Sequence, residues 1–243
     1  MAFAIIPCRM GSERFYGKPL ALINGIPMYW HVYNTVKKCL FVSGVVVATE
    51  DWEIVKDCTR RNVPCVGSLK GIWPTGSDRV FQASRKLGIK SGLVFNVQGD
   101  EPLITHGHIK ELIDLFDDPA VMVGTLVRKL NHDEARDEDV VKAQFDGTMR
   151  IFNFSRIMPE PGVYYGSIGI MGFRVGALAD FARMEQSKWE KHENIELQRL
   201  IDNDYPVHCA VTDVPTIGVD RIEDIKKVEE VLNAQDNCRS MCN

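Results

Sequence analysis

The first half of the chain alternates short apolar runs with stretches of helical period, and this alternation constrains the fold most. The apolar runs cover 3–8, 44–49, 64–66 and 92–97. Between them, apolar residues recur at helical spacing over 28–40, 51–61 and 77–87. Strands that alternate with helices predict an α/β fold, here a mostly parallel, doubly wound sheet with helices on both faces.

The middle of the chain changes to closely spaced strands. Its pattern predicts a helix over 107–116 and strands over 121–127, 140–145, 149–154 and 164–173, with Asp146-Gly147 as a hairpin turn. A helix over 188–203, a strand over 207–211 and a helix over 222–232 follow. No Pro/Gly-rich linker divides the chain, so we expect one domain, 1–243, with an embedded substrate or dimerisation subdomain at about 130–173.

Composition excludes several classes of protein. The net charge of -4 gives no broad basic field, so nucleic acid is not an expected partner, and an anionic substrate needs clustered cations. No stretch is long enough to span a bilayer and the first apolar run is too short for a signal peptide, so we expect a cytoplasmic protein without a membrane partner. Seven cysteines without Cys-x-x-Cys spacing predict free thiols, and Cys238 and Cys242 are interpreted as part of a frayed C-terminus.

The loop after the first apolar run (7–19) is typical of a phosphate-binding turn. Gly11 and Gly17 allow close approach of the backbone to phosphate oxygens. Three cations stand beside them: Arg9, Arg14 and Lys18. The spacing matches neither the dinucleotide fingerprint nor the P-loop. The alternative interpretation is a solvent-exposed basic turn.

The loop after the fourth apolar run (96–102) carries carboxylates. Asp100 and Glu101 stand at a predicted strand end and Pro102 stiffens the turn. A carboxylate here is suited to Mg²⁺, which prefers oxygen ligands and bridges to phosphates. The alternative role for Asp100 is to cap the next helix. Gln98 is a candidate hydrogen-bond partner for a substrate. Since ligands bind beyond the carboxyl ends of parallel strands, the two loops together indicate a metal-dependent enzyme acting on a nucleoside triphosphate.

The motifs resemble those of a known family. Loops 7–19 and 96–102 are similar to the signature loops of the 3-deoxy-manno-octulosonate cytidylyltransferases, the CMP-Kdo synthetases. Three shorter stretches, at 75–79, 154–156 and 218–224, resemble further motifs of that family in the same order. The resemblance spans nearly the whole chain.

The resemblance implies a reaction and a set of site residues. The reaction transfers CMP from CTP to the anomeric hydroxyl of a 2-keto-3-deoxy sugar acid, releasing pyrophosphate, for lipopolysaccharide or surface-glycan synthesis; a homodimer is also implied. Nucleotide binding is assigned to Arg9, Arg14, Lys18, Ser77 and Arg79. Sugar binding is assigned to Gln98, Arg156 and Glu196, Mg²⁺ binding to Asp100 and Asp220, and catalysis to Lys18, Asp100 and Asp220.

The chain also departs from the family pattern. Phe15 and Tyr16 replace a usual leucine and proline, Ser167 begins a Ser-Ile-Gly where His-Leu-Gly is usual, and Leu197 replaces a glutamine. The connection 156–167 is shorter than usual. Three of these features lie on the sugar side, so a different acidic or amino sugar is an alternative acceptor. A catalytically silent nucleotide-binding relative is a further alternative, which the retained cations and aspartates disfavour.

Two other clusters receive structural interpretations. His106 and His108 flank a glycine at a predicted helix start, and we expect a helix-start role there rather than metal binding. Glu190 and Glu193 recur with Glu196 at helical spacing, which predicts a solvated face.

Overall fold

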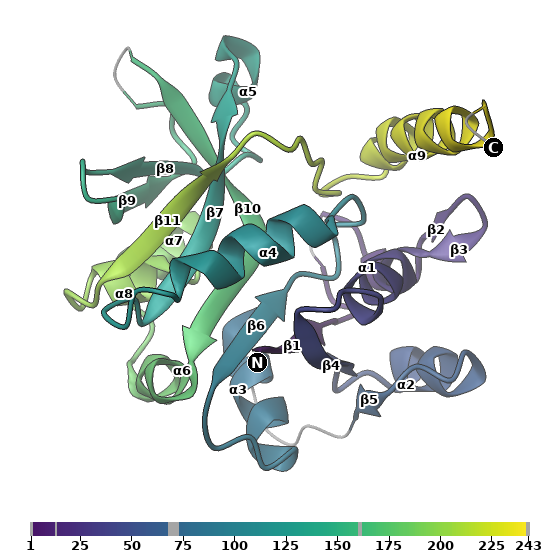
Figure 1. The fold of residues 1–243 in the computed structure, drawn as a ribbon, viewed down its shortest axis with the longest axis horizontal. Helices are drawn as coiled ribbons and strands as arrows, with labels where there is room; N and C mark the ends of the chain where they lie inside the picture. Colours follow the sequence, from purple (N-terminus) through teal and green to yellow (C-terminus); the bar gives the residue numbers. More distant parts are fainter. Residues whose placement is uncertain (1, 13, 68–72, 160–161, 242–243) are drawn as a thin grey trace.

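A computed structural model describes residues 2–12, 14–67, 73–159 and 162–241, with side chains up to Gln235. Within these ranges nine strands form one sheet in the order β5-β4-β1-β6-β10-β7-β11-β9-β8 (Figure 1). The tail cysteines Cys238 and Cys242 lie outside the described side chains. No helix in the described ranges has the length and apolar character needed to cross a membrane.

The first half of the sheet is parallel, as the alternation predicts. Its strands are β1 (Ala2–Pro7), β4 (Val42–Ala48), β5 (Cys65–Val66) and β6 (Leu93–Val97). β1 lies between β4 and β6 and pairs in parallel with both, and β4 pairs in parallel with β5. The helices that connect them are α1 (Met28–Lys37), α2 (Trp52–Arg60) and α3 (Gly76–Lys86).

Helices cover both faces of this half. Successive residues of a strand point to opposite faces, and Ile5 and Ile6 are both fully buried. Ile6 packs in a cluster with Tyr29 and Val32 of α1, whereas Ile5 packs in another with Val80 of α3. The two clusters confirm the predicted α/β sheet with helices on both faces.

The second half extends the sheet with strands that are mostly antiparallel. These are β7 (Val123–Leu130), β8 (Lys142–Phe145), β9 (Arg150–Ser155), β10 (Tyr164–Arg174) and β11 (Val207–Thr212). β10 runs antiparallel to β6 and β7, and β11 runs parallel to β7. β8 and β9 form the hairpin predicted at Asp146, and β9 pairs with the start of β11. The strand-rich insert therefore continues the main sheet.

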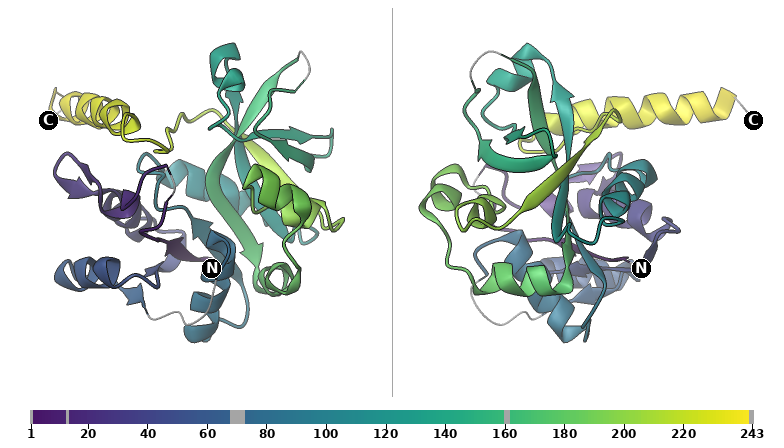
Figure 2. Two further views of the ribbon diagram at one scale, coloured as in Figure 1. Left: turned by 180° about the vertical axis from the view of Figure 1, so that it is seen from behind. Right: turned by 60° about the vertical axis from the view of Figure 1, so that its left-hand side comes forward.

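The remaining helices show where the sequence patterns misled. α4 (His106–Leu115) lies close to its expected position, but α6 (Val175–Arg183) was not predicted. α5 (His132–Arg136) falls in the charged stretch 131–139, whose sequence indicates either a solvated loop or a short helix. The expected helix over 188–203 is wrong as a single helix: it divides into α7 (Lys188–Glu193) and α8 (Gln198–Ile201). The division falls at Asn194, which ends α7 in the left-handed conformation at φ 54°. α9 (Asp224–Met241) is longer than expected and projects from the body of the molecule (Figure 2).

A small additional unit joins the first loop to α9. The short 3-10 helix Lys18–Leu20 leads into a hairpin of β2 (Leu22–Ile23) and β3 (Ile26–Pro27). Ile23 of this hairpin packs with Val219 and with Val228 of α9. The contact brings the C-terminal part of the chain next to the loop that follows β1.

Candidate functional site

The site lies where the loops after β1 and β6 meet. These strands are adjacent and parallel, with Ile5 paired to Asn96, so their carboxyl ends lie at the same edge of the sheet. A third segment, 213–220, connects β11 to α9 and reaches the same place, where the Val219 N–H donates to the Asp100 carbonyl at 2.9 Å. Three distant parts of the chain thus contribute to one site.

Lys18 lies at the centre of this site. Gly17 before it adopts φ 74°, a conformation that glycine takes without steric cost, and the turn presents Lys18 toward the 213–220 segment. The Lys18 Nζ donates to Asp100 Oδ2 at 2.5 Å and to the Val219 carbonyl at 2.8 Å. Asp220 Oδ1 lies 3.5 Å from the same nitrogen. The two aspartates named from the resemblance therefore face a single cation.

The charges around Lys18 shift its pKa and those of its neighbours. Burial alone would lower the pKa of the Lys18 ammonium, but the charges of Asp100 and Asp220 outweigh burial and raise it. Burial raises the pKa of Asp220, against the opposing charge of Lys18. Burial also raises the pKa of Glu101 to about 7, and the charge of Asp100 adds to the shift. The site thus holds several carboxylates that an added cation would stabilise.

The donor set of this site fits Mg²⁺. Asp100 and Asp220 converge on one positive group, so both reach a common cation position. Among the described residues, no cluster of three or more potential metal ligands is found. Mg²⁺ does not need one, because it commonly binds through one or two carboxylates and completes its shell with water and substrate phosphates.

The two loop arginines differ in their surroundings. Arg14 Nη2 donates to Asp220 Oδ1 at 3.0 Å, and Nη1 donates to Asp139. Asp139 also accepts from Arg221 Nε at 2.6 Å, so it holds two cations beside the site. Arg9 is exposed. Burial alone would raise the pKa of Glu50, but hydrogen bonding and charge from Arg79 lower it, and the charge of Arg9 adds to this. The sequence indicated no role for Asp139, which stood in a charged stretch interpreted as a solvated loop or short helix.

The predicted nucleotide-side residues lie at and after the start of α3. Thr75 caps this helix, and its side chain exchanges hydrogen bonds with Asp78 in a capping box. The Ser77 N–H donates to Glu196 Oε2 at 2.6 Å, and Asn96 Nδ2 donates to Ser77 Oγ at 3.0 Å. Arg79 pairs through two nitrogens with Glu50, each at 2.6 Å, and is only 3% exposed. In this structure a buried Arg79 is therefore engaged in an ion pair with Glu50 at the surface.

The predicted sugar-side residues fall into two groups. Gln98 Nε2 lies 3.4 Å from Glu196 Oε1, so these two residues do come together, next to Ser77. Arg156 is held separately by backbone carbonyls: Nε donates to Glu193 at 2.7 Å, and Nη1 donates to Glu138 at 2.9 Å. Burial lowers the pKa of its guanidinium, and the nearby charge of Arg14 adds to the shift.

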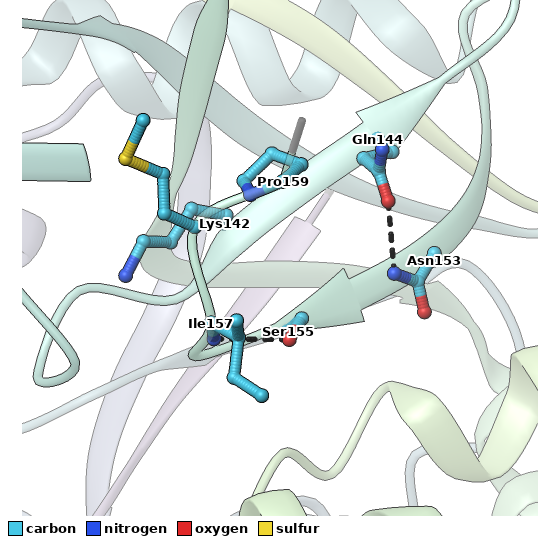
Figure 3. Close-up of a pocket in the computed structure, with 7 residues that line it drawn as sticks. Lys142, Gln144, Asn153, Ser155, Ile157 and Pro159 are labelled. Atoms are coloured by element: carbon cyan, nitrogen blue, oxygen red, sulfur yellow. Dashed lines mark hydrogen bonds between the residues drawn. The ribbon is translucent and has the colours of Figure 1, made fainter. Parts of the chain in front are cut away.

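A cavity of about 250 Å³ opens beside Arg156, on the β8–β9 hairpin. Figure 3 shows its polar lining, in which Asn153 Nδ2 donates to Gln144 Oε1 at 2.9 Å and the Ile157 N–H donates to Ser155 Oγ at 3.0 Å. Lys142 also lines it and donates to the Arg156 carbonyl at 2.6 Å. Lys142 thus connects the cavity to the backbone of Arg156.

Two interpretations from sequence are corrected here. Glu190 and Glu193 do not form a solvated face: Glu190 is 2% exposed and binds Arg199 at 2.7 Å, and Glu193 accepts from the Arg156 N–H at 2.9 Å. Their helical spacing gave no sign of the buried Arg199 that Glu190 pairs with, or of the backbone N–H that Glu193 binds. The alternative of Asp100 as a helix cap is also wrong, because Thr105 caps α4. The helix-start role of His108 is confirmed, since it completes the capping box with Thr105.

Comparison with known proteins identifies the family. Residues 3–206 match the family model described as cytidylyltransferase. A 3-deoxy-manno-octulosonate cytidylyltransferase of Nitratidesulfovibrio vulgaris is 36% identical over 245 aligned positions, covering 96% of this chain and 97% of the relative. The chain belongs to the cytidylyltransferase family. The resemblance drawn from the motifs is thereby confirmed.

Further comparisons agree with this cytidylyltransferase assignment. An enzyme of the same description from Oleidesulfovibrio alaskensis is 36% identical, covering 95% of this chain and 96% of its own length. The structure of a CMP:2-keto-3-deoxy-manno-octonic acid synthetase complexed with CTP superposes with a TM-score of 0.87 and 28% identity. It covers 96% of this chain and 99% of that one, so the fold is shared over essentially the whole length.

Proposed function

We propose that this cytidylyltransferase transfers CMP from CTP to the anomeric hydroxyl of a 2-keto-3-deoxy sugar acid, Kdo or a close relative, and releases pyrophosphate. The observation that carries the proposal is the convergence of Asp100, Asp220 and Lys18 beside the glycine-containing loop. The names of the relatives and the CTP in the similar structure support the choice of nucleotide and acceptor.

Asp100 and Asp220 would hold Mg²⁺, as the fit of the donor set supports. Bound there, the ion would withdraw charge from phosphate oxygens. Lys18 and Arg14 already stand beside these aspartates, so both are placed to neutralise the triphosphate and then the leaving pyrophosphate. Catalysis would come from positioning and electrostatics, without a covalent nucleophile.

The acceptor sugar would bind beside Gln98 and Glu196. The guanidinium of Arg156 is suited to pair with the carboxylate of that sugar. Glu196 joins the two substrate sides, since it accepts from the Ser77 N–H and lies beside Gln98. Ser167 replaces the histidine that is usual in the family, and this removes a substrate contact on the sugar side. A different acidic or amino sugar is therefore the alternative acceptor. The same reaction chemistry would apply to either sugar.

We also propose that the protein is a homodimer that works in the cytoplasm, for lipopolysaccharide or surface-glycan synthesis. The strand-rich insert supports a dimer interface, because large apolar side chains are exposed on it: Phe152, Ile157 and Val163. The free thiols of the described cysteines are consistent with a reducing compartment.

Sedimentation of wild type and Phe152→Ser tests the dimer, and a wild-type monomer at micromolar concentration would contradict it.

Pyrophosphate release tests the reaction. Each of the four nucleoside triphosphates is incubated with Mg²⁺ and with Kdo or a panel of acidic and amino sugars. Release with CTP and one acceptor is expected, and CTP binding without release on any acceptor would indicate a silent relative.

Asp100→Ala tests the site within the same assay. We expect it to abolish turnover while the protein stays folded, since the loss of one such charge typically costs at least about a hundredfold in rate. Asp114→Ala is the matched control, because Asp114 is 48% exposed and pairs only with Lys110 on its own helix among the interactions described. Near-full Mg²⁺-dependent activity of Asp100→Ala would contradict the assignment.

A further inference from the structure

Glu101 is a buried carboxylate to which the proposed reaction gives no task. It follows Asp100 directly and is 8% exposed. Its Oε1 accepts from the Gly169 N–H at 2.8 Å, and its Oε2 accepts from Thr216 Oγ1 at 3.1 Å. Both oxygens are therefore engaged by groups from elsewhere in the chain.

These two hydrogen bonds join three separate parts of the molecule. Glu101 stands just beyond β6, Gly169 lies in β10, and Thr216 lies in the connector 213–220 that carries Asp220. The carboxylate is tightly enclosed: a Cβ at Gly169 would lie 2.7 Å from Glu101 Cγ, and one at Gly218 would lie 3.3 Å from Oε1. The lack of side chains at these two positions leaves room for this one group.

The connector depends on such contacts for its position. It contains neither helix nor strand, so no regular backbone pairing places it. His108 Nε2 lies 3.1 Å from the Val214 carbonyl at one end, and Asp100 and Lys18 bind the backbone of Val219 at the other. Thr216 lies between these anchors, and its 6% exposure shows that its hydroxyl is buried with the Glu101 carboxylate.

We propose that Glu101 is a positioning residue: by binding Thr216 and Gly169 it fixes the connector, and so holds Asp220 where it shares one cation with Asp100. A carboxylate accepts from both donors at once, which an apolar leucine in the same place cannot do. The kinetic consequence rests on the proposed function, but the positioning itself does not.

Hydrogen exchange of the Val219 amide tests the positioning without substrate. The full-length chain, free of nucleotide and metal, is compared as wild type, Glu101→Leu, Thr216→Val and the double variant. Each single variant is expected to speed Val219 exchange by up to about tenfold, the factor that the loss of one hydrogen bond corresponds to. The double variant is expected to add little, because both changes break the same link.

Thr125→Val is the matched control, since Thr125 is also a buried threonine whose hydroxyl donates to a neighbouring element, the Ile170 carbonyl at 2.9 Å. It is expected to leave Val219 exchange unchanged. Unchanged exchange in Glu101→Leu and Thr216→Val would overturn the proposal. So would equal acceleration at amides of β1, because that indicates general loosening.

Kinetics of CTP turnover give the second measurement. Thr216→Val is expected to lower kcat about tenfold with KM for CTP within about threefold of wild type, the pattern of an interaction needed mainly in the transition state. Faster Val219 exchange with wild-type kcat would overturn the link to the reaction. If wild type shows no turnover, the proposed function fails, and the exchange result still decides the role of Glu101.

Discussion

At the scale of single residues, Asp57 shows how a buried carboxylate makes stability depend on pH. Tyr29 Oη donates to it at 2.8 Å and Arg61 Nε at 2.9 Å, and Arg60 also binds it. Burial alone would raise the pKa of Asp57, but these hydrogen bonds outweigh burial and lower it. A lowered pKa stabilises the fold above the unfolded-state pKa of about 4, and this stabilisation is lost as pH falls through the folded pKa. Asp57→Asn should therefore cost about 1–3 kcal/mol in urea unfolding at pH 7, and the difference from wild type should shrink below about pH 4.

The control for this prediction is Asp114→Asn, which removes an exposed carboxylate of a same-helix pair and should cost at most about 0.5 kcal/mol. A cost for Asp57→Asn that stays constant down to pH 3 would show that its charge is not the cause.

At the scale of elements, a buried cation holds the start of α3 against α7 and α8. Arg199 of α8 binds Asp78 Oδ1 at 3.0 Å and Glu190 Oε1 of α7 at 2.7 Å, and all three side chains are at most 7% exposed. Arg199→Met would leave two buried carboxylates without their cation, so we expect a loss of about 3–5 kcal/mol in the free energy of unfolding. Arg183→Met, at a 76% exposed arginine, should cost about 0.5 kcal/mol or less in the same urea titration.

Asp78 belongs to the capping box next to Ser77, so this ion pair also supports the nucleotide side of the site. A free energy of unfolding for Arg199→Met within about 1 kcal/mol of wild type would contradict this prediction. It would show that Asp78 and Glu190 do not need the cation to remain buried.

At the scale of the whole molecule, the site exists only in the folded chain. Lys18 binds groups that lie 82 and 201 residues away in sequence. A ligand of this site therefore binds the native state alone, and Mg²⁺ with CTP at 100 times its dissociation constant should add about 2.7 kcal/mol to stability. Thermal unfolding with and without Mg²⁺–CTP measures this, and Asp100→Ala should lose most of the shift. An equal shift in wild type and Asp100→Ala would place the nucleotide elsewhere.

Local patterns gave the fold of the first half because its contacts follow from local sequence. Each apolar run there is short, each connecting helix has one apolar face, and strands joined through helices pair in parallel. α6 carries the same kind of signal, with Ala177, Leu178 and Phe181 all buried, and could have been found from it. The break at Asn194 could not, because a single left-handed residue barely changes the pattern of apolar spacing.

For the site, the sequence by itself named the side chains that the proposed reaction uses. Strand-end motifs and the family resemblance named Lys18, Asp100 and Asp220, and cytidylyltransferase family membership is established. Only the tertiary structure decided that Lys18 stands between the two aspartates and that Glu101 binds Thr216 of the connector beside them. The reason is physical: local sequence sets backbone conformation and apolar faces, whereas buried charges find partners that are distant along the chain and adjacent only after the sheet has formed.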